Sequence, residues 1–175
     1  VCVTAESDIE RCLLLARQPA VTIASFGDML RVPGVDGTSL QSLRAAGADV
    51  RIVGSPLDAL ELARLNPERQ VVFLGVGFET TAPAVAASLI GAGNLANFSI
   101  LSLHKLVPPA LATLLDDEAL AVDGFICPGH VSVITGSAAY SEIVARKRAA
   151  VITGFEPVDI LEGIHALLGQ MLDQD

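Results

Sequence analysis

The sequence predicts an α/β protein: a three-layer, Rossmann-like sandwich with a mostly parallel sheet of about six strands. Short apolar runs alternate with segments of helical periodicity along nearly the whole chain. Successive strands that are joined by helices must run parallel, with right-handed crossovers. The predicted strands are continuous apolar runs, which is typical of strands that helices cover on both faces.

Composition supports this class and limits the number of domains. Hydrophobic residues make up 51% of the 175 residues, whereas aromatic residues make up 4% and tryptophan is absent. The core must therefore consist of aliphatic side chains, which let helices pack closely on a sheet. The length predicts a single α/β domain over residues 1–175, with the alternative that residues 150–175 belong to a neighbouring α/β domain.

Local signals place the elements of the first half. Ser7 can cap a helix that runs to about Arg17. Gly47 ends a short second helix, and Ser55 with Pro56 forms a cap followed by proline at the first helical position. A loop is expected between the first strand and the second helix. Strands are expected at 20–25, 50–53 and 70–76, and helices at 7–17, 38–46 and 55–66.

The second half continues the alternation. Residues 91–97 predict a turn, and the pair Pro128-Gly129 is expected to break the fifth strand. Gly154 follows the sixth strand and precedes the last helix. Strands are expected at 98–103, 124–127 and 150–152, and helices at 81–90, 108–115, 137–148 and 157–172.

The net charge and the lack of targeting signals limit the classes of partner and the cellular location that we expect. The net charge of −9 repels phosphate backbones and anionic lipids, so neither nucleic acid nor a membrane surface is an expected partner. The uncharged stretch 80–103 is long enough to span a bilayer. Proline, glycine and asparagine interrupt it, and it divides into a helix, a turn and a strand. No signal peptide is visible at the start, and a cytoplasmic location is expected.

The cysteines indicate a reducing compartment. Cys2, Cys12 and Cys127 are odd in number and widely spaced, which does not fit a disulfide framework. Cys12 lies on the apolar face of its helix and is expected in the core. Cys127 ends a strand, where packing is the first expectation and a reactive role the alternative. Cys2 has no second cysteine two to four positions away, so spacing alone gives it no metal signature.

Ionisable residues follow five of the six predicted strands. They are Asp28, Glu79, His104, His130 and Glu156. Open α/β sheets bind ligands outside the carboxyl ends of their strands, so we expect these residues to share one edge of the sheet and to form a polar cleft.

Each of these residues also has a purely structural interpretation. Glu79 and Glu156 precede helices, where the helix dipole favours a carboxylate. Both occur in a Gly-Phe-Glu turn, and the repetition favours function, with the phenylalanine anchored in the core and the carboxylate aimed at a ligand. His130 lies in a Pro-Gly-His turn, an unusual place for a core histidine, whereas His104 is evenly balanced. His165 lies in mid-helix and is expected at the surface or in packing.

Common cofactor motifs are missing from the chain. It has no glycine-rich dinucleotide fingerprint, no phosphate loop with Gly-Lys-Ser/Thr and no Gly-x-Ser-x-Gly. The residues alone therefore predict a polar cleft and do not name a reaction.

The turns themselves resemble those of a known family. The segment 26–34 reads Phe-Gly-Asp-Met-Leu-Arg-Val-Pro-Gly, and 77–83 reads Gly-Phe-Glu-Thr-Thr-Ala-Pro. Further matching segments are 47–53, 55–59, 128–132 and 154–161. In this order they are similar to the HypD family of hydrogenase maturation factors, over essentially the whole chain.

The resemblance implies a function. HypD proteins help to build the Fe(CN)₂(CO) unit of [NiFe]-hydrogenases, with HypC carrying the iron and HypE supplying cyanide. The family has two α/β domains around a cleft and a separate [4Fe-4S] region. The implied catalytic residues are Cys2, Glu79, Thr80, His130 and Glu156. Asp28, Arg31 and Thr81 would contact the iron unit, and Cys2, as the last thiol of a Cys-Pro-Val-Cys motif, would also be a metal ligand.

The chain departs from the family pattern in several places. The Cys-Gly-Gly-His segment, the first cysteine of Cys-Pro-Val-Cys and the cysteines that hold the cluster are missing, and Cys127 stands where a small residue such as alanine is expected. The chain thus resembles the central part of HypD and is not expected to complete the reaction alone. Two alternatives stay open: a non-catalytic docking module for HypC, and an unrelated α/β enzyme that binds a small anion at helix N-termini.

Overall fold

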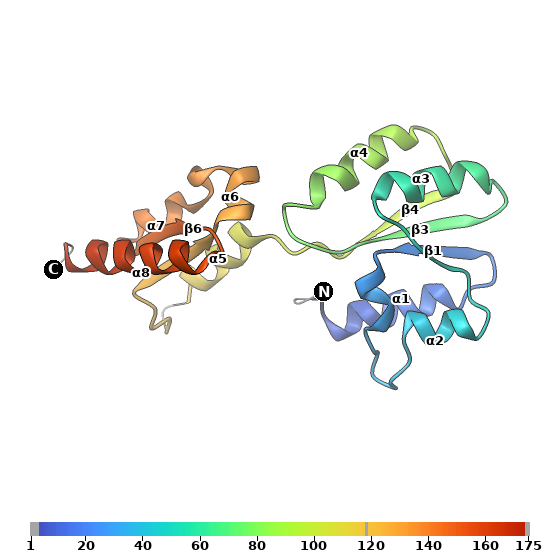
Figure 1. Ribbon diagram of the computed structural model, residues 1–175, viewed down its shortest axis with the longest axis horizontal. Helices are drawn as coiled ribbons and strands as arrows, with labels where there is room; N and C mark the ends of the chain where they lie inside the picture. The colour runs from blue at the N-terminus through green and yellow to red at the C-terminus, as the bar shows by residue number, and fades with distance from the viewer. Residues whose placement is uncertain (1–3, 118, 174–175) are drawn as a thin grey trace. The chain divides into compact units, whose positions relative to one another are not determined.

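The computed structural model describes residues 4–117 and 119–173. The chain forms two compact units, residues 1–105 and residues 106–175, each with a parallel sheet of its own (Figure 1). The predicted α/β class and the count of about six strands are confirmed, and the strands divide between a sheet of four and a sheet of two. Within the described residues, no helix is both long and apolar enough to cross a membrane.

The first unit is a four-stranded sheet between two pairs of helices. Its strands are β1 (Val21–Ser25), β2 (Val50–Ile52), β3 (Gln70–Gly75) and β4 (Phe98–Ser102), in the order β2-β1-β3-β4, all parallel. Its α-helices are α1 (Glu6–Ala16), α2 (Leu40–Ala45), α3 (Pro56–Leu65) and α4 (Ala82–Ala92). Figure 1 shows α1 and α2 on one face of this sheet and α3 and α4 on the other. This three-layer arrangement explains why its strands are apolar on both sides.

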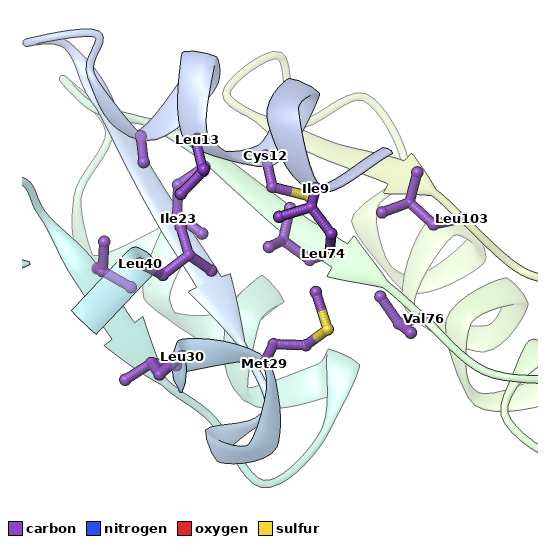
Figure 2. Close-up of a cluster of buried hydrophobic side chains, with 12 residues drawn as sticks. Ile9, Cys12, Leu13, Ile23, Met29, Leu30, Leu40, Leu74, Val76 and Leu103 are labelled. Atoms are coloured by element: carbon purple, nitrogen blue, oxygen red, sulfur yellow. The ribbon is translucent and has the colours of Figure 1, made fainter. Parts of the chain in front are cut away.

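Two apolar clusters fill the layers of the first unit. Cys12 and Leu13 of α1 pack with Ile23 and Leu74 of the sheet, as Figure 2 shows, so the expected core position of Cys12 is confirmed. On the opposite face, Phe73 packs with small residues of α3 and with α4. Neighbouring residues of one strand therefore serve different clusters, because successive side chains point to opposite faces.

Side-chain caps mark the start of α2 and α3, whereas α1 and α4 begin without one. Ser7 lies inside α1 and Ala5 is its N-cap residue, so the cap expected at Ser7 is wrong. The Oγ of Ser39 accepts a hydrogen bond from the Ser42 backbone N–H at 3.2 Å, and the Ser42 Oγ accepts one from the Ser39 N–H at 2.9 Å. The Oγ of Ser55 accepts from the Asp58 N–H at 3.2 Å, with Pro56 at the first position of α3. The pair Ser39 and Ser42 forms a capping box, and Ser55 is a single N-cap. The cap at Ser55 agrees with the helix start that the sequence predicted.

The second unit is built on a two-stranded parallel sheet. β5 (Gly124–Pro128) pairs with β6 (Ala149–Thr153), and α8 (Pro157–Leu172) packs against both strands. The remaining helical segments are α5 (Val107–Leu115), α6 (Gly129–Thr135), the 3-10 turn η2 (Ser137–Tyr140) and α7 (Ser141–Ala145). Cys127 packs with Leu115, Tyr140 and Ile143, which gives this unit an apolar core of its own.

One predicted helix takes a different form. The sequence predicted a break at Pro128-Gly129 and a single helix over 137–148, but α6 begins at Gly129, directly after β5. Pro128 has extended φ and ψ angles, so it serves both as the last residue of the strand and as the N-cap of α6. Gly136 then separates α6 from η2 and α7.

Candidate functional site

The residues expected to form one polar edge are divided between the two units. Asp28, Glu79 and His104 follow strands of the first sheet, whereas His130 and Glu156 follow the two strands of the second. The expectation of a single shared sheet edge is therefore wrong, because the six strands do not form one sheet. Within each unit the strands are parallel, so the residues that follow them do lie at the same, carboxyl edge.

Asp28 and Arg31 lie in the 3-10 turn η1 (Gly27–Arg31), directly after β1. The two residues between them, Met29 and Leu30, are buried in the core of the first unit, whereas Asp28 and Arg31 are exposed. The turn is thus anchored by its middle residues and presents a carboxylate and a guanidinium to solvent. The sequence predicted a loop here, and the adjacent apolar residues Met29 and Leu30 are the signal that could have indicated an ordered turn.

The turn after β3 carries Glu79 into the interior. Gly77 has a φ of +145°, and a Cβ at this position would lie 2.2 Å from the Thr81 Oγ1. The backbone N–H and the hydroxyl of Thr81 both donate to the carbonyl of Phe78 at 3.1 Å, which closes the turn. Glu79 is only 6% exposed, while Thr80 is exposed.

The two Gly-Phe-Glu turns have different conformations. Glu79 is buried before α4, whereas Glu156 is exposed and is the N-cap residue of α8, with no capping hydrogen bond from its side chain. Phe78 is half-buried, but Phe155 is 63% exposed, so the expectation that this phenylalanine anchors its turn in the core is wrong for the second turn. The shared tripeptide therefore does not impose a shared geometry.

His104 lies close against the end of β3. Its Nδ1 is 3.1 Å from the Ser102 Oγ, and its Nε2 is buried without a hydrogen-bond partner. A Cβ on Gly75 would lie 2.9 Å from the His104 Cε1, so the ring occupies the space that a side chain would need. Burial lowers the pKa of His104, because the imidazolium loses its solvation. These contacts describe a packed, neutral histidine.

His130 stands in a different environment. It lies in the first turn of α6, it is exposed, and its ring stacks on that of Phe155 with centroids 4.9 Å apart and planes inclined by 18°. Among the residues that the structure describes, no hydrogen bond reaches either of its ring nitrogens. Sequence reasoning selected His130 but missed Phe155 as its partner.

Two cavities lie at this edge of the second unit. The larger, of about 500 Å³, is lined by Gly129, His130, Ser132, Val133, Ser137, Ile152, Thr153 and Gly154. The smaller, of about 220 Å³, is lined by Ile126, Cys127, Pro128, Thr153, Gly154, Phe155 and Ile160. Among the described residues that line the larger cavity, His130 is the only one with an ionisable side chain, so its imidazole is the protein group there that can take up or release a proton.

The two described cysteines are packing residues. Burial, with a further contribution from the carboxylate of Asp8, raises the pKa of Cys12 to about 11. Burial also raises the pKa of Cys127, which is 2% exposed. Both thiols therefore resist ionisation, and only the thiolate is nucleophilic. Cys2, the predicted redox thiol and metal ligand, lies outside the described residues.

No metal centre is formed by the described part of the chain. Over residues 4–117 and 119–173, no group of three or more His, Cys, Asp or Glu side chains is placed to hold an ion. A [4Fe-4S] cluster needs four thiolates, and the whole sequence has three cysteines. The residues present do not fit such a cluster.

The fold and these turns define a parallel α/β protein with polar turns and cavities at the carboxyl ends of its strands, where α/β proteins of this class bind ligands. The comparison with protein families identifies it further. The family model HypD, described as the hydrogenase formation hypA family, matches residues 1–175. The chain belongs to the HypD family.

Individual relatives agree with this assignment. Three of them are the hydrogenase maturation factors HypD of Rhodobacter capsulatus, Escherichia coli strain K12 and Azotobacter vinelandii. They are 47%, 45% and 44% identical to this chain over 174, 175 and 179 residues, which cover 98% of it. The same matches cover 46%, 47% and 47% of the relatives, so the chain spans about half the length of the curated relatives it matches.

Proposed function

We propose that this chain acts in [NiFe]-hydrogenase maturation, as the part of a HypD scaffold on which the Fe(CN)₂(CO) unit is assembled with HypC and HypE. The family match over all of residues 1–175 carries the proposal. The iron unit is the substrate of this assembly, and the proposal places the protein in the cytoplasm. Membership of the HypD family argues against the alternative of an unrelated α/β enzyme that binds a small anion.

The proposal gives the polar turns the task of holding the iron unit and its ligands. In the first unit, hydrogen bonds to the iron unit or its ligands would come from four side chains: Asp28, Arg31, Thr80 and Thr81. Glu79 would stabilise the turn or bind a ligand. Asp28, Arg31 and Thr80 are exposed at the carboxyl edge of the sheet, which supports a contact role. Fixed dipoles of this kind position a ligand without having to reorganise.

In the second unit the proposal relies on His130 and Glu156. His130 can take up or release a proton at a ring nitrogen, and it lines a cavity without another ionisable group. Glu156 is exposed at the start of α8, where its carboxylate can accept hydrogen bonds. Both residues follow paired strands, which supports a joint role at this edge.

Cys2 is proposed as the thiol that exchanges with a neighbouring cysteine and contacts iron. The chain has three cysteines, and Cys12 and Cys127 are buried with raised pKa values. Thiol–disulfide exchange requires an accessible thiolate, which disfavours these two. The [4Fe-4S] cluster of the full-length family is assigned to cysteines that this chain does not contain.

A second candidate function is a docking module for HypC that performs no chemistry itself. Several large apolar side chains of the second unit are exposed, among them Val133 at 84%, Val158 at 64% and Leu161 at 66%. Exposed apolar residues in such number are typical of surfaces that bind other proteins. This observation favours binding of a partner protein, which both candidate functions include.

The experiment replaces the matching half of the Escherichia coli relative by residues 1–175 and expresses the chimaera in a strain that lacks its own HypD. We expect hydrogenase activity to be restored. The variant Cys2→Ala should abolish maturation while HypC still co-purifies, because alanine removes the thiol but no described packing. Normal maturation by Cys2→Ala would reject the redox role and leave the docking module. Loss of HypC binding would instead assign Cys2 to the docking surface.

A further inference from the structure

The turn after β6 contributes an aromatic ring that the proposed function has not used. Phe155 is 63% exposed, although burial of a phenylalanine is normally favourable, and its only aromatic contact among the described residues is His130. The two rings stand just beyond the adjacent parallel strands β5 and β6, whose last paired residues are Pro128 and Thr153. The stack is therefore set by the register of the sheet.

The backbone brings these turns unusually close together. A Cβ on Gly129 would lie 2.5 Å from the carbonyl oxygen of Thr153. No side chain fits at that position without a backbone shift, so glycine lets the first turn of α6 approach the end of β6. His130 and Phe155 follow Gly129 and Gly154 directly, and their rings meet at a centroid distance of 4.9 Å.

The stacking geometry has a chemical consequence. Nearly parallel rings contact each other through their faces, and the two nitrogens of an imidazole lie at its edge. Phe155 thus restrains the plane of His130 without using either nitrogen. A histidine oriented by a hydrogen bond has one nitrogen committed to its partner, whereas this one keeps both for a ligand.

We propose that Phe155 is a positioning residue for His130. It holds the imidazole so that one ring nitrogen is presented to a ligand in the 500 Å³ cavity and the other stays accessible for the proton. This inference rests on the proposed function, since it assigns Phe155 to the same site. Phe155 itself lines the smaller cavity, and Thr153 and Gly154 line both.

The first test observes the stack directly and needs no assay of maturation. The chain has three histidines, so ¹H–¹³C spectra of the 175-residue protein show three imidazoles, and His130→Gln identifies one of them. We expect the ring protons of His130 upfield of those of exposed His165, because they lie over an aromatic face. Phe155→Ala should move them downfield, to the range of His165, and Phe155→Tyr should not.

Leu161→Ala is the matched control. Leu161 is 66% exposed on α8 and lines neither cavity, so its variant removes a similar exposed apolar group and should leave the His130 signals in place. If Phe155→Ala leaves these signals where they are in the wild type, the stack does not orient His130 and the inference is overturned.

The second test uses the chimaera in the HypD-deficient strain. We expect Phe155→Ala to lower hydrogenase activity by roughly tenfold, as misplacement of a reacting group does, and Phe155→Tyr to retain it. Normal activity of Phe155→Ala, despite shifted His130 signals, would overturn the positioning role. Normal activity of His130→Gln would reject the proposed function of His130 itself, an outcome distinct from failure of the stack.

Discussion

The Nζ of Lys105 lies 3.1 Å from the Oδ2 of Asp8 and joins the end of the segment after β4 to the first turn of α1. Asp8 is 6% exposed, and its other cation, Arg11, is more distant at 3.4 Å. A buried carboxylate is costly without partners, so this ion pair is expected to matter more than an exposed one.

Lys105→Met should lower the free energy of unfolding by about 1 to 3 kcal/mol, since it leaves a buried charge with one weaker partner. Arg17→Met is the control, because Arg17 and Asp36 form an exposed pair at 3.7 Å and should contribute less than about 1 kcal/mol. Urea unfolding followed by circular dichroism measures both. Equal effects of the two variants would show that the burial of Asp8 is not decisive.

His104 should make stability depend on pH. Its pKa in the folded protein is lowered from 6.5 by burial, so the folded state binds its proton less readily than the unfolded chain does. Stability from this group is therefore present above about pH 6.5 and declines as the pH falls below that value.

The variant His104→Gln should flatten the loss of unfolding free energy between pH 7.5 and 5.5. His165→Gln serves as the control, because His165 is exposed on α8 and has no buried nitrogen. Urea unfolding at pH 7.5 and at pH 5.5 gives, for each of the two variants, the difference in unfolding free energy from the wild type. A slope that His104→Gln leaves unchanged would mean that another group is responsible for the dependence.

The sequence predicted the fold better than it predicted the site. Apolar runs such as 71–74 and caps such as Ser55-Pro56 are local signals, and the strands and helices they predict are confirmed. Which strands pair is not a local property, and nothing in the apolar pattern indicated that β5 and β6 form a sheet apart from the other four. The expected single polar edge failed for this reason.

Local sequence signals likewise predicted some features of the site residues and not others. The Pro-Gly-His context correctly predicted a histidine outside the core, because glycine and proline mark a turn. The Gly-Phe-Glu repeat predicted two equivalent turns, yet Glu79 is buried and Glu156 is exposed. The tripeptide alone therefore does not determine whether its carboxylate is buried.

Replacement of Gly129 is predicted to destabilise the second unit. The methyl group of Gly129→Ala would meet the Thr153 carbonyl at 2.5 Å, so the β5–β6 edge must shift. We expect a loss of about 1 to 3 kcal/mol in unfolding free energy, as for other overpacked sites, and movement of the His130 signals.

Gly169→Ala is the control for the added methyl group. Gly169 lies in α8, and a Cβ there has no neighbouring atom within 4 Å. Alanine should stabilise the helix by up to about 1 kcal/mol. Thermal unfolding distinguishes the two variants, and a stable Gly129→Ala protein with unshifted His130 signals would contradict the close approach of the two turns.

The two Gly-Phe-Glu turns allow a last comparison, between Glu79→Gln and Glu156→Gln. Both changes keep shape and remove one charge. Glu79 is 6% exposed inside a closed turn, so the amide must satisfy an environment built for a carboxylate, and we expect lower stability together with a partial loss of hydrogenase activity in the chimaera. Glu156 is exposed at the start of α8, so its variant should keep its unfolding free energy within about 0.5 kcal/mol. Any loss of maturation by Glu156→Gln therefore reports on ligand contact rather than on folding. Full activity of Glu156→Gln would remove it from the site, whereas a stable Glu79→Gln protein without activity would assign Glu79 to the substrate instead of to the turn.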